Sequence, residues 1–130
     1  MNRFALIVCV ALLAGCGSRP TAAFVFPESA GVWKFKGVKD LAPAEAPEQI
    51  RRLGLKRAQS AEYEGPGRIT ARVFEMTAGA AAFEVEQTWR PVADTVAFHH
   101  ESYFAVIHWE NAERAAVSAF VKEMEKQLGR

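Results

Sequence analysis

The sequence predicts an α+β fold in which a mainly antiparallel sheet of about five strands carries helices on one face. Segments that alternate apolar and polar residues, as half-buried strands do, follow one another in pairs. The Gly-Pro-Gly sequence at residues 65–67 is a strong turn signal that joins one such pair as an antiparallel hairpin. The last segment repeats apolar residues at three- and four-residue steps, which is typical of an amphipathic helix.

The first elements expected are a strand and a short helix. Residues 32–38 alternate apolar side chains with lysines and are therefore expected to form a half-buried strand. Residues 48–53 are expected to be helical, because Pro47 suits a helix start and Gly54 suits a C-terminal cap.

The centre of the chain is expected to hold the first hairpin and a second helix. Residues 56–63 and 68–76 are the strands on either side of the Gly-Pro-Gly turn. Residues 79–88 are expected to be helical, and Pro91 ends this helix because proline cannot continue it.

A second hairpin and a long helix complete the fold. Residues 92–99 and 102–110 are the expected strands, with a turn at His100-Glu101, and Asn111 is expected to cap a helix over residues 112–128. The order is then β-α-β-β-α-β-β-α, whose first six elements also match the order of a ferredoxin-like fold.

The strand at residues 102–110 is apolar on both faces, and such a strand is usually covered on both faces. If the helices cover one face, the other is covered by residues 24–26, by a partner, or by a bound apolar ligand. The residues expected to line such a partner or ligand site are Phe74, Phe104 and Val106.

The N-terminus has the three-part layout of a secretory signal, with a basic residue, an apolar run and small residues before Cys16. The run from Phe4 to Ala14 has 11 residues, whereas a transmembrane helix needs about 20. Its ending, residues 13–16 (Leu-Ala-Gly-Cys), resembles the lipobox of bacterial lipoproteins. A plain secreted protein or an uncleaved anchor is the alternative.

The resemblance implies cleavage before Cys16 and a diacylglyceryl thioether on its sulfur, so that the lipid anchors the chain in a membrane. The chain is then divided into a signal peptide at residues 1–15, a lipidated tether at 16–31 and a single α+β domain at 32–130. Gly17 stands where an aspartate signals inner-membrane retention in bacteria with two membranes. The resemblance therefore implies the periplasmic face of the outer membrane if the host has two membranes.

Processing leaves a chain with balanced charge and no free thiol. Removal of Arg3 leaves 15 basic and 15 acidic side chains, a balance that gives no electrostatic footprint for nucleic acid. Cys9 leaves with the signal and Cys16 carries the lipid, so we expect no disulfide and a domain stabilised by packing alone.

No group of residues predicts catalysis, a metal site or a cofactor. His108 lies six or more strand residues from the turn that holds His99 and His100, roughly 20 Å at about 3.3 Å per residue, so the three histidines are not expected to share a metal. Glu84 and Glu86 are two residues apart on a helix and point in different directions. We therefore expect no enzyme, no metal and no cofactor.

The domain is also similar to small envelope domains of unknown function, through residues 73–76, 82–83 and 103–107, and this similarity implies no activity. The favoured hypothesis is a non-catalytic envelope lipoprotein whose domain binds another envelope component. A carrier or sensor of an apolar small molecule is the alternative.

A local basic cluster consists of Arg51, Arg52, Lys56 and Arg57. It is expected either to contact anionic lipid headgroups or to be a solvated face.

Overall fold

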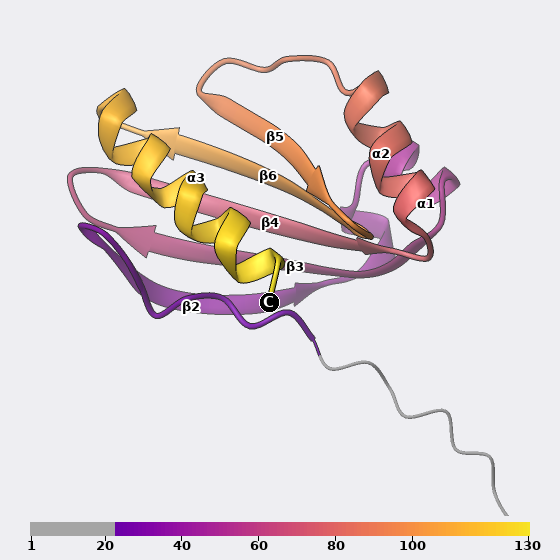
Figure 1. Ribbon diagram of the computed structural model, residues 1–130, viewed down its shortest axis with the longest axis horizontal. Helices are drawn as coiled ribbons and strands as arrows, with labels where there is room; N and C mark the ends of the chain where they lie inside the picture. Colours follow the sequence, from indigo (N-terminus) through magenta and orange to yellow (C-terminus); the bar gives the residue numbers. More distant parts are fainter. Residues whose placement is uncertain (1–22) are drawn as a thin grey trace, which may run out of the picture.

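The structure is a computed structural model that describes residues 23–130 (Figure 1). The expected signal peptide and Cys16 lie outside the described residues. The elements in chain order are β1 (Ser29–Ala30), β2 (Trp33–Leu41), the 3-10 turn η1 (Pro43–Glu45), α1 (Glu48–Arg52), β3 (Leu55–Glu64), β4 (Arg68–Met76), α2 (Gly79–Thr88), β5 (Thr95–His100), β6 (Tyr103–Glu110) and α3 (Arg114–Leu128). None of the helices within residues 23–130 has the length and apolar character needed to cross a bilayer.

Six strands form one antiparallel sheet in the order β1-β2-β3-β4-β6-β5 (Figure 1). The α+β class and the antiparallel pairing are confirmed. The strand count exceeds the expected five because Ser29–Ala30 pairs with β2. A ferredoxin-like fold contains βαβ crossovers that bring parallel strands into one sheet. Every pair of neighbouring strands in this sheet is antiparallel. The structure therefore matches the expected ferredoxin-like fold only roughly.

Element ends differ from the expected ones mainly around the second hairpin. The turn lies at Glu101-Ser102 rather than His100-Glu101, because His100 is paired with Tyr103. The last helix begins at Arg114 and not at residue 112. Asn111 does not cap this helix, since its backbone adopts a left-handed φ of 52° in the connection that follows β6.

The helices cover both faces of the sheet, so the expectation that they share one face is wrong. Neighbouring residues of a strand point to opposite faces, and Val73 and Phe74 of β4 belong to different core clusters. Val73 packs in the cluster beneath α3, whereas Phe74 packs in the cluster formed with α1 and α2. Figure 1 shows α3 crossing the sheet while α1 and α2 gather at one end of it.

Each face is apolar over only part of the length of its strands. On the α3 face of β4, the apolar run ends at Val73 and the next residue on that face is Glu75. On the opposite face, Thr70 and Arg72 come before the buried Phe74. The apolar stretch therefore changes face partway along the strand. Thr70 and Arg72 are not members of the core cluster formed with α1 and α2.

Aromatic side chains hold α3 against the sheet. Trp33 is fully buried, and its indole Nε1–H donates to the carbonyl oxygen of Ala116 in α3 at 3.0 Å. The rings of Tyr63 and Phe120 meet edge-to-face with centroids 4.7 Å apart, within the range preferred by aromatic pairs. The burial of these aromatic side chains is the main interaction that holds α3 on the sheet.

The packed chain begins before residue 32, the expected domain boundary. Phe26 is buried in the α3 cluster. The Tyr63 hydroxyl donates to the carbonyl oxygen of Pro27 at 2.7 Å, and the Gln127 side-chain amide donates to the carbonyl oxygen of Val25 at 2.9 Å. Burial raises the pKa of Tyr63, which keeps the phenol protonated as a donor. This segment extends the cover of the α3 face, whereas α1 and α2 cover part of the other face.

Candidate functional site

A pocket of about 260 Å³ lies on the α1/α2 face, at the part of β4 that contains Thr70 and Arg72. We call it the Arg72 pocket, and it is lined by Thr70, Arg72, Trp89, Val92, Thr95, Val106 and His108. Two cross-strand pairs of β4 and β6 form its floor, because Thr70 is opposite His108 and Arg72 is opposite Val106. Trp89 and Val92 come from the loop after α2, so the pocket lies between this loop and the sheet.

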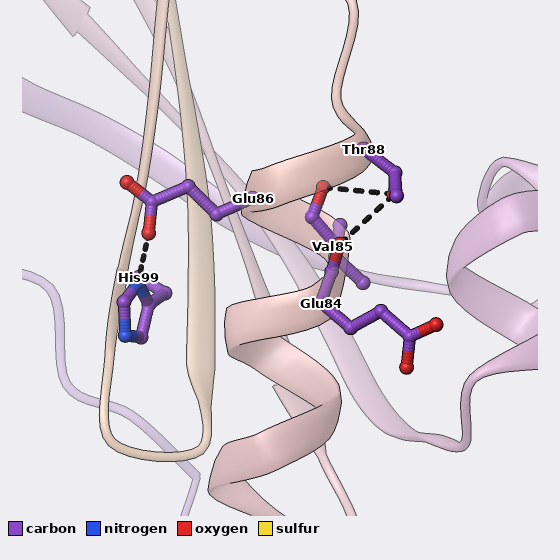
Figure 2. Close-up of polar contacts among 5 residues, drawn as sticks. All are labelled: Glu84, Val85, Glu86, Thr88 and His99. Atoms are coloured by element: carbon purple, nitrogen blue, oxygen red, sulfur yellow. Dashed lines mark hydrogen bonds and ion pairs between the residues drawn. The ribbon is translucent and has the colours of Figure 1, made fainter.

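The last turn of α2 contacts β5 through Glu86 and α1 through Thr88, whose hydroxyl accepts a hydrogen bond from the Gln49 side-chain amide, and Trp89 follows this turn. Figure 2 shows the Glu86 carboxylate pointing to the His99 ring of β5, while Glu84 points away. The Thr88 hydroxyl donates to the carbonyl oxygen of Glu84 at 2.9 Å (Figure 2). The Trp89 ring then packs on the buried Phe104, with centroids 5.1 Å apart.

The polar groups of the Arg72 pocket are one guanidinium, two hydroxyls and one imidazole. The Thr95 hydroxyl lies 3.3 Å from the His108 Nδ1, and the His108 Nε2 lies 3.8 Å from the Glu110 carboxylate. The Arg72 side chain makes no hydrogen bond or ion pair with any other residue within 23–130. The pocket thus presents one unpaired positive charge beside an apolar wall.

A larger hollow of about 650 Å³ lies on the opposite face, between β5 and α3. We call it the β5–α3 groove. Its apolar lining residues are Val96, Trp109, Val117 and Val121. Two acidic and two basic side chains are also part of the lining, namely Asp94, Glu125, Arg114 and Lys122. The strand that borders it, β5, is the outermost strand of the sheet.

The expected basic cluster is partly neutralised by a buried acid. Glu75 is only 6% exposed, and its carboxylate lies 3.4 Å from the Lys56 ammonium and 3.9 Å from the Arg57 guanidinium. Arg52 lies 4.0 Å from the Glu48 carboxylate. Burial and the nearby Glu75 charge raise the pKa of Tyr103. These contacts stabilise the end of the sheet, and the two carboxylates offset part of the positive charge of the cluster.

The structure does not bring the three expected binding residues into one pocket. Phe74 and Phe104 are 1% and 0% exposed and stack on each other with centroids 6.2 Å apart. Both belong to the core cluster formed with α1 and α2. Only Val106 lines a pocket, and it does so beside Arg72.

The three histidines are placed separately. His99 contacts Glu86 of α2, His108 lies in the Arg72 pocket, and His100 lies near the β5–β6 turn, 4.0 Å from the Glu101 carboxylate. No group of three or more His, Cys, Asp or Glu side chains that could hold a metal ion occurs within residues 23–130.

Sequence reasoning missed Arg72, Trp89 and Thr95 as pocket residues. The signal for Arg72 was present, because Thr70 and Arg72 are polar residues on one face of a strand that lies in the middle of the sheet. No comparable signal exists for Trp89, whose position depends on how the loop after α2 returns over the sheet.

No family model matches the chain, and no curated protein or solved structure matches it significantly.

Proposed function

We propose that this chain is a membrane-anchored envelope lipoprotein whose α+β domain binds another envelope protein and does not act as an enzyme. In this proposal, Cys16 carries the lipid and the domain binds an extended segment of the partner along β5. The free edge of β5, next to an apolar groove, is the observation that carries it.

The outer edge of β5 has the hydrogen-bonding groups needed to bind another strand. In the described part of the chain, β5 pairs only with β6, and no loop or turn forms a backbone hydrogen bond to its outer side. An extended peptide that adds to such an edge gains main-chain hydrogen bonds. Its alternate side chains are then available for recognition in neighbouring pockets.

The two edges of the sheet differ in a way that supports this choice. Natural proteins protect edge strands with charged residues, bulges or short covering strands. The β2 edge has all three, with lysines along the strand, a bulge between Phe35 and Gly37, and β1 over its first residues. The six residues of β5, Thr95–His100, include no Asp, Glu, Lys or Arg.

The β5–α3 groove supplies a surface for the partner's side chains. Val96 is 37% exposed on the α3 face of β5, with Trp109 and Val121 among the other apolar lining residues of the groove. Side chains on one face of an added strand would reach this apolar surface, and burying it contributes about 25 cal/mol per Å². Charged groups beside the apolar residues would favour one orientation of the partner segment.

A carrier or sensor of an apolar small molecule remains the second candidate, and the groove volume favours it. Ligand sites typically enclose 300–1,000 Å³, and the β5–α3 groove measures about 650 Å³. In that case the ligand would contact Val96, Trp109 and Val121 without pairing to the β5 backbone.

Site-specific crosslinking distinguishes these two functions. A photoreactive amino acid at Val96 of the full chain, in its native membrane, should form a defined adduct with one envelope protein. Val38 is the matched control, because it is also an exposed valine on the same sheet face but lies on β2. A lipid adduct at Val96 would support the carrier. Equal protein adducts from both positions, or none from Val96, would contradict binding at β5.

Lipidation is tested separately from partner binding. Cys16→Ser should abolish labelling by radioactive palmitate and partition into detergent, because the thioether cannot form and several acyl chains are needed for stable anchoring. Cys9→Ser is the control and should label normally, since Cys9 leaves with the signal peptide in this proposal. Fatty-acid labelling that persists in Cys16→Ser would show that the lipobox interpretation is wrong.

A further inference from the structure

The Arg72 pocket is independent of the β5 edge and has its own recognition chemistry. Arg72 stands in the middle of β4, which is paired with β3 on one side and with β6 on the other. Its backbone is therefore held on both sides by the sheet. Its exposed side chain has no partner in the described chain, although a guanidinium is well suited to bind a carboxylate with two parallel hydrogen bonds.

Two carboxylates near the pocket, those of Glu110 and Glu62, do not pair with Arg72. Glu110 lies beside His108, with 3.8 Å between the carboxylate and Nε2. Glu62 is opposite Thr70, two pairs along the strands from the pair that contains Arg72. Neither acid forms an ion pair with Arg72. Arg72 is the one arginine or lysine in the lining, so the pocket suits a ligand with one negative charge.

The rest of the lining fits an apolar ligand body. Val106 is on the floor beside Arg72, and Trp89 and Val92 come from the loop that lies over this half of the sheet. The Trp89 ring is held by its contact with the buried Phe104, so it offers a fixed aromatic surface. A volume of about 260 Å³ is below the usual range for drug-sized ligands and suits a smaller molecule.

We propose that the Arg72 pocket binds a small apolar carboxylate, with the guanidinium of Arg72 on the carboxylate and Trp89 against the apolar body. The Thr70 hydroxyl is an additional hydrogen-bond donor of the site, whereas the Thr95 hydroxyl already donates to the carbonyl oxygen of Ala93 at 3.1 Å. This inference goes beyond the proposed partner binding, because it uses the opposite face of the sheet.

The test uses phenylacetate as the probe and the full chain in phospholipid nanodiscs. Phenylacetate should shift the indole N–H resonance of Trp89 in a saturable way, with assignment by Trp89→Phe. Arg72→Gln should weaken this binding at least about tenfold, because hydrogen bonds to charged groups contribute more than neutral ones. Phenylacetamide, which has the same shape without the charge, should also bind at least about tenfold more weakly than phenylacetate.

Arg68→Gln is the matched control, because Arg68 is exposed on the same strand and the same face but does not line the pocket. It should leave phenylacetate affinity unchanged. Equal weakening by Arg68→Gln would show a general charge effect, and equal affinity for the amide would show apolar partition only. Either result overturns the proposal, as does a Trp89 signal that does not saturate with phenylacetate.

Discussion

Replacing Phe120 by alanine should lower the free energy of unfolding by about 3–5 kcal/mol, the range for truncation of a large buried aromatic residue. Phe120 is fully buried in the middle of α3, and its ring packs on Tyr63 with centroids 4.7 Å apart. Its removal leaves a cavity between the helix and the sheet. Urea unfolding of the full chain, followed by circular dichroism, measures the change.

Lys122→Ala is the control for this experiment. Lys122 is exposed on the same helix, two residues further on, so its truncation should change stability by less than about 0.5 kcal/mol. If both variants unfold at the same urea concentration as the natural chain, α3 is not attached through Phe120. An effect of the predicted size would be a large fraction of the stability of a small domain.

Replacing Gly67 by alanine should cost stability near the upper end of about 1–3 kcal/mol, the usual range for forcing atoms into filled space. A β-carbon on Gly67 would overlap the carbonyl oxygen of Glu110 and lie 2.6 Å from that of Asn111. Both obstacles are backbone atoms, one at the last residue of β6 and one at the first residue of the connection to α3. The turn or this connection must therefore move, and thermal unfolding measures the loss.

Gly37 provides the comparison for Gly67. It also lies in the sheet region, but a β-carbon there would meet no atom within 4 Å. Gly37→Ala should consequently change stability by less than about 1 kcal/mol, since only the backbone preference of glycine is lost. A similar loss in both variants would mean that close packing at Gly67 is not the cause.

The sequence was sufficient to predict whether most segments form helices or strands. It was not sufficient to predict which face of the sheet each helix covers. Turn chemistry at residues 65–67 and the spacing of apolar residues in α3 depend on local interactions, and local signals can be interpreted directly. Helix placement depends on contacts between distant segments. Along β4, the apolar residues shift from the face that contains Val73 to the face that contains Phe74, and this shift is present in the sequence. It indicates that both faces are covered.

The candidate sites were harder to predict for the same reason. Phe104 lies on the strand at residues 102–110, which was expected to need cover on both faces, and Phe74 was expected to line the same site. The structure supplies this cover with α1 and α2. The Arg72 pocket and the β5–α3 groove each combine residues from three or more segments. Two properties of single segments could have been recognised, namely the lack of charged residues in 95–100 and the polar pair Thr70 and Arg72 on one face of a strand.

If the chain is lipidated as proposed, the attachment of residues 24–27 to the domain would limit the distance between the domain and the membrane. In the lipidated form proposed above, eight residue steps separate Cys16 from Phe24, where packing against the domain begins. At about 3.5 Å per residue, even a fully extended chain spans only about 28 Å. The domain would then search for its partner within a thin layer along the bilayer. Inserting ten or more residues after Gly17 would widen that layer without altering the domain and would reveal whether the partner's position relative to the membrane matters.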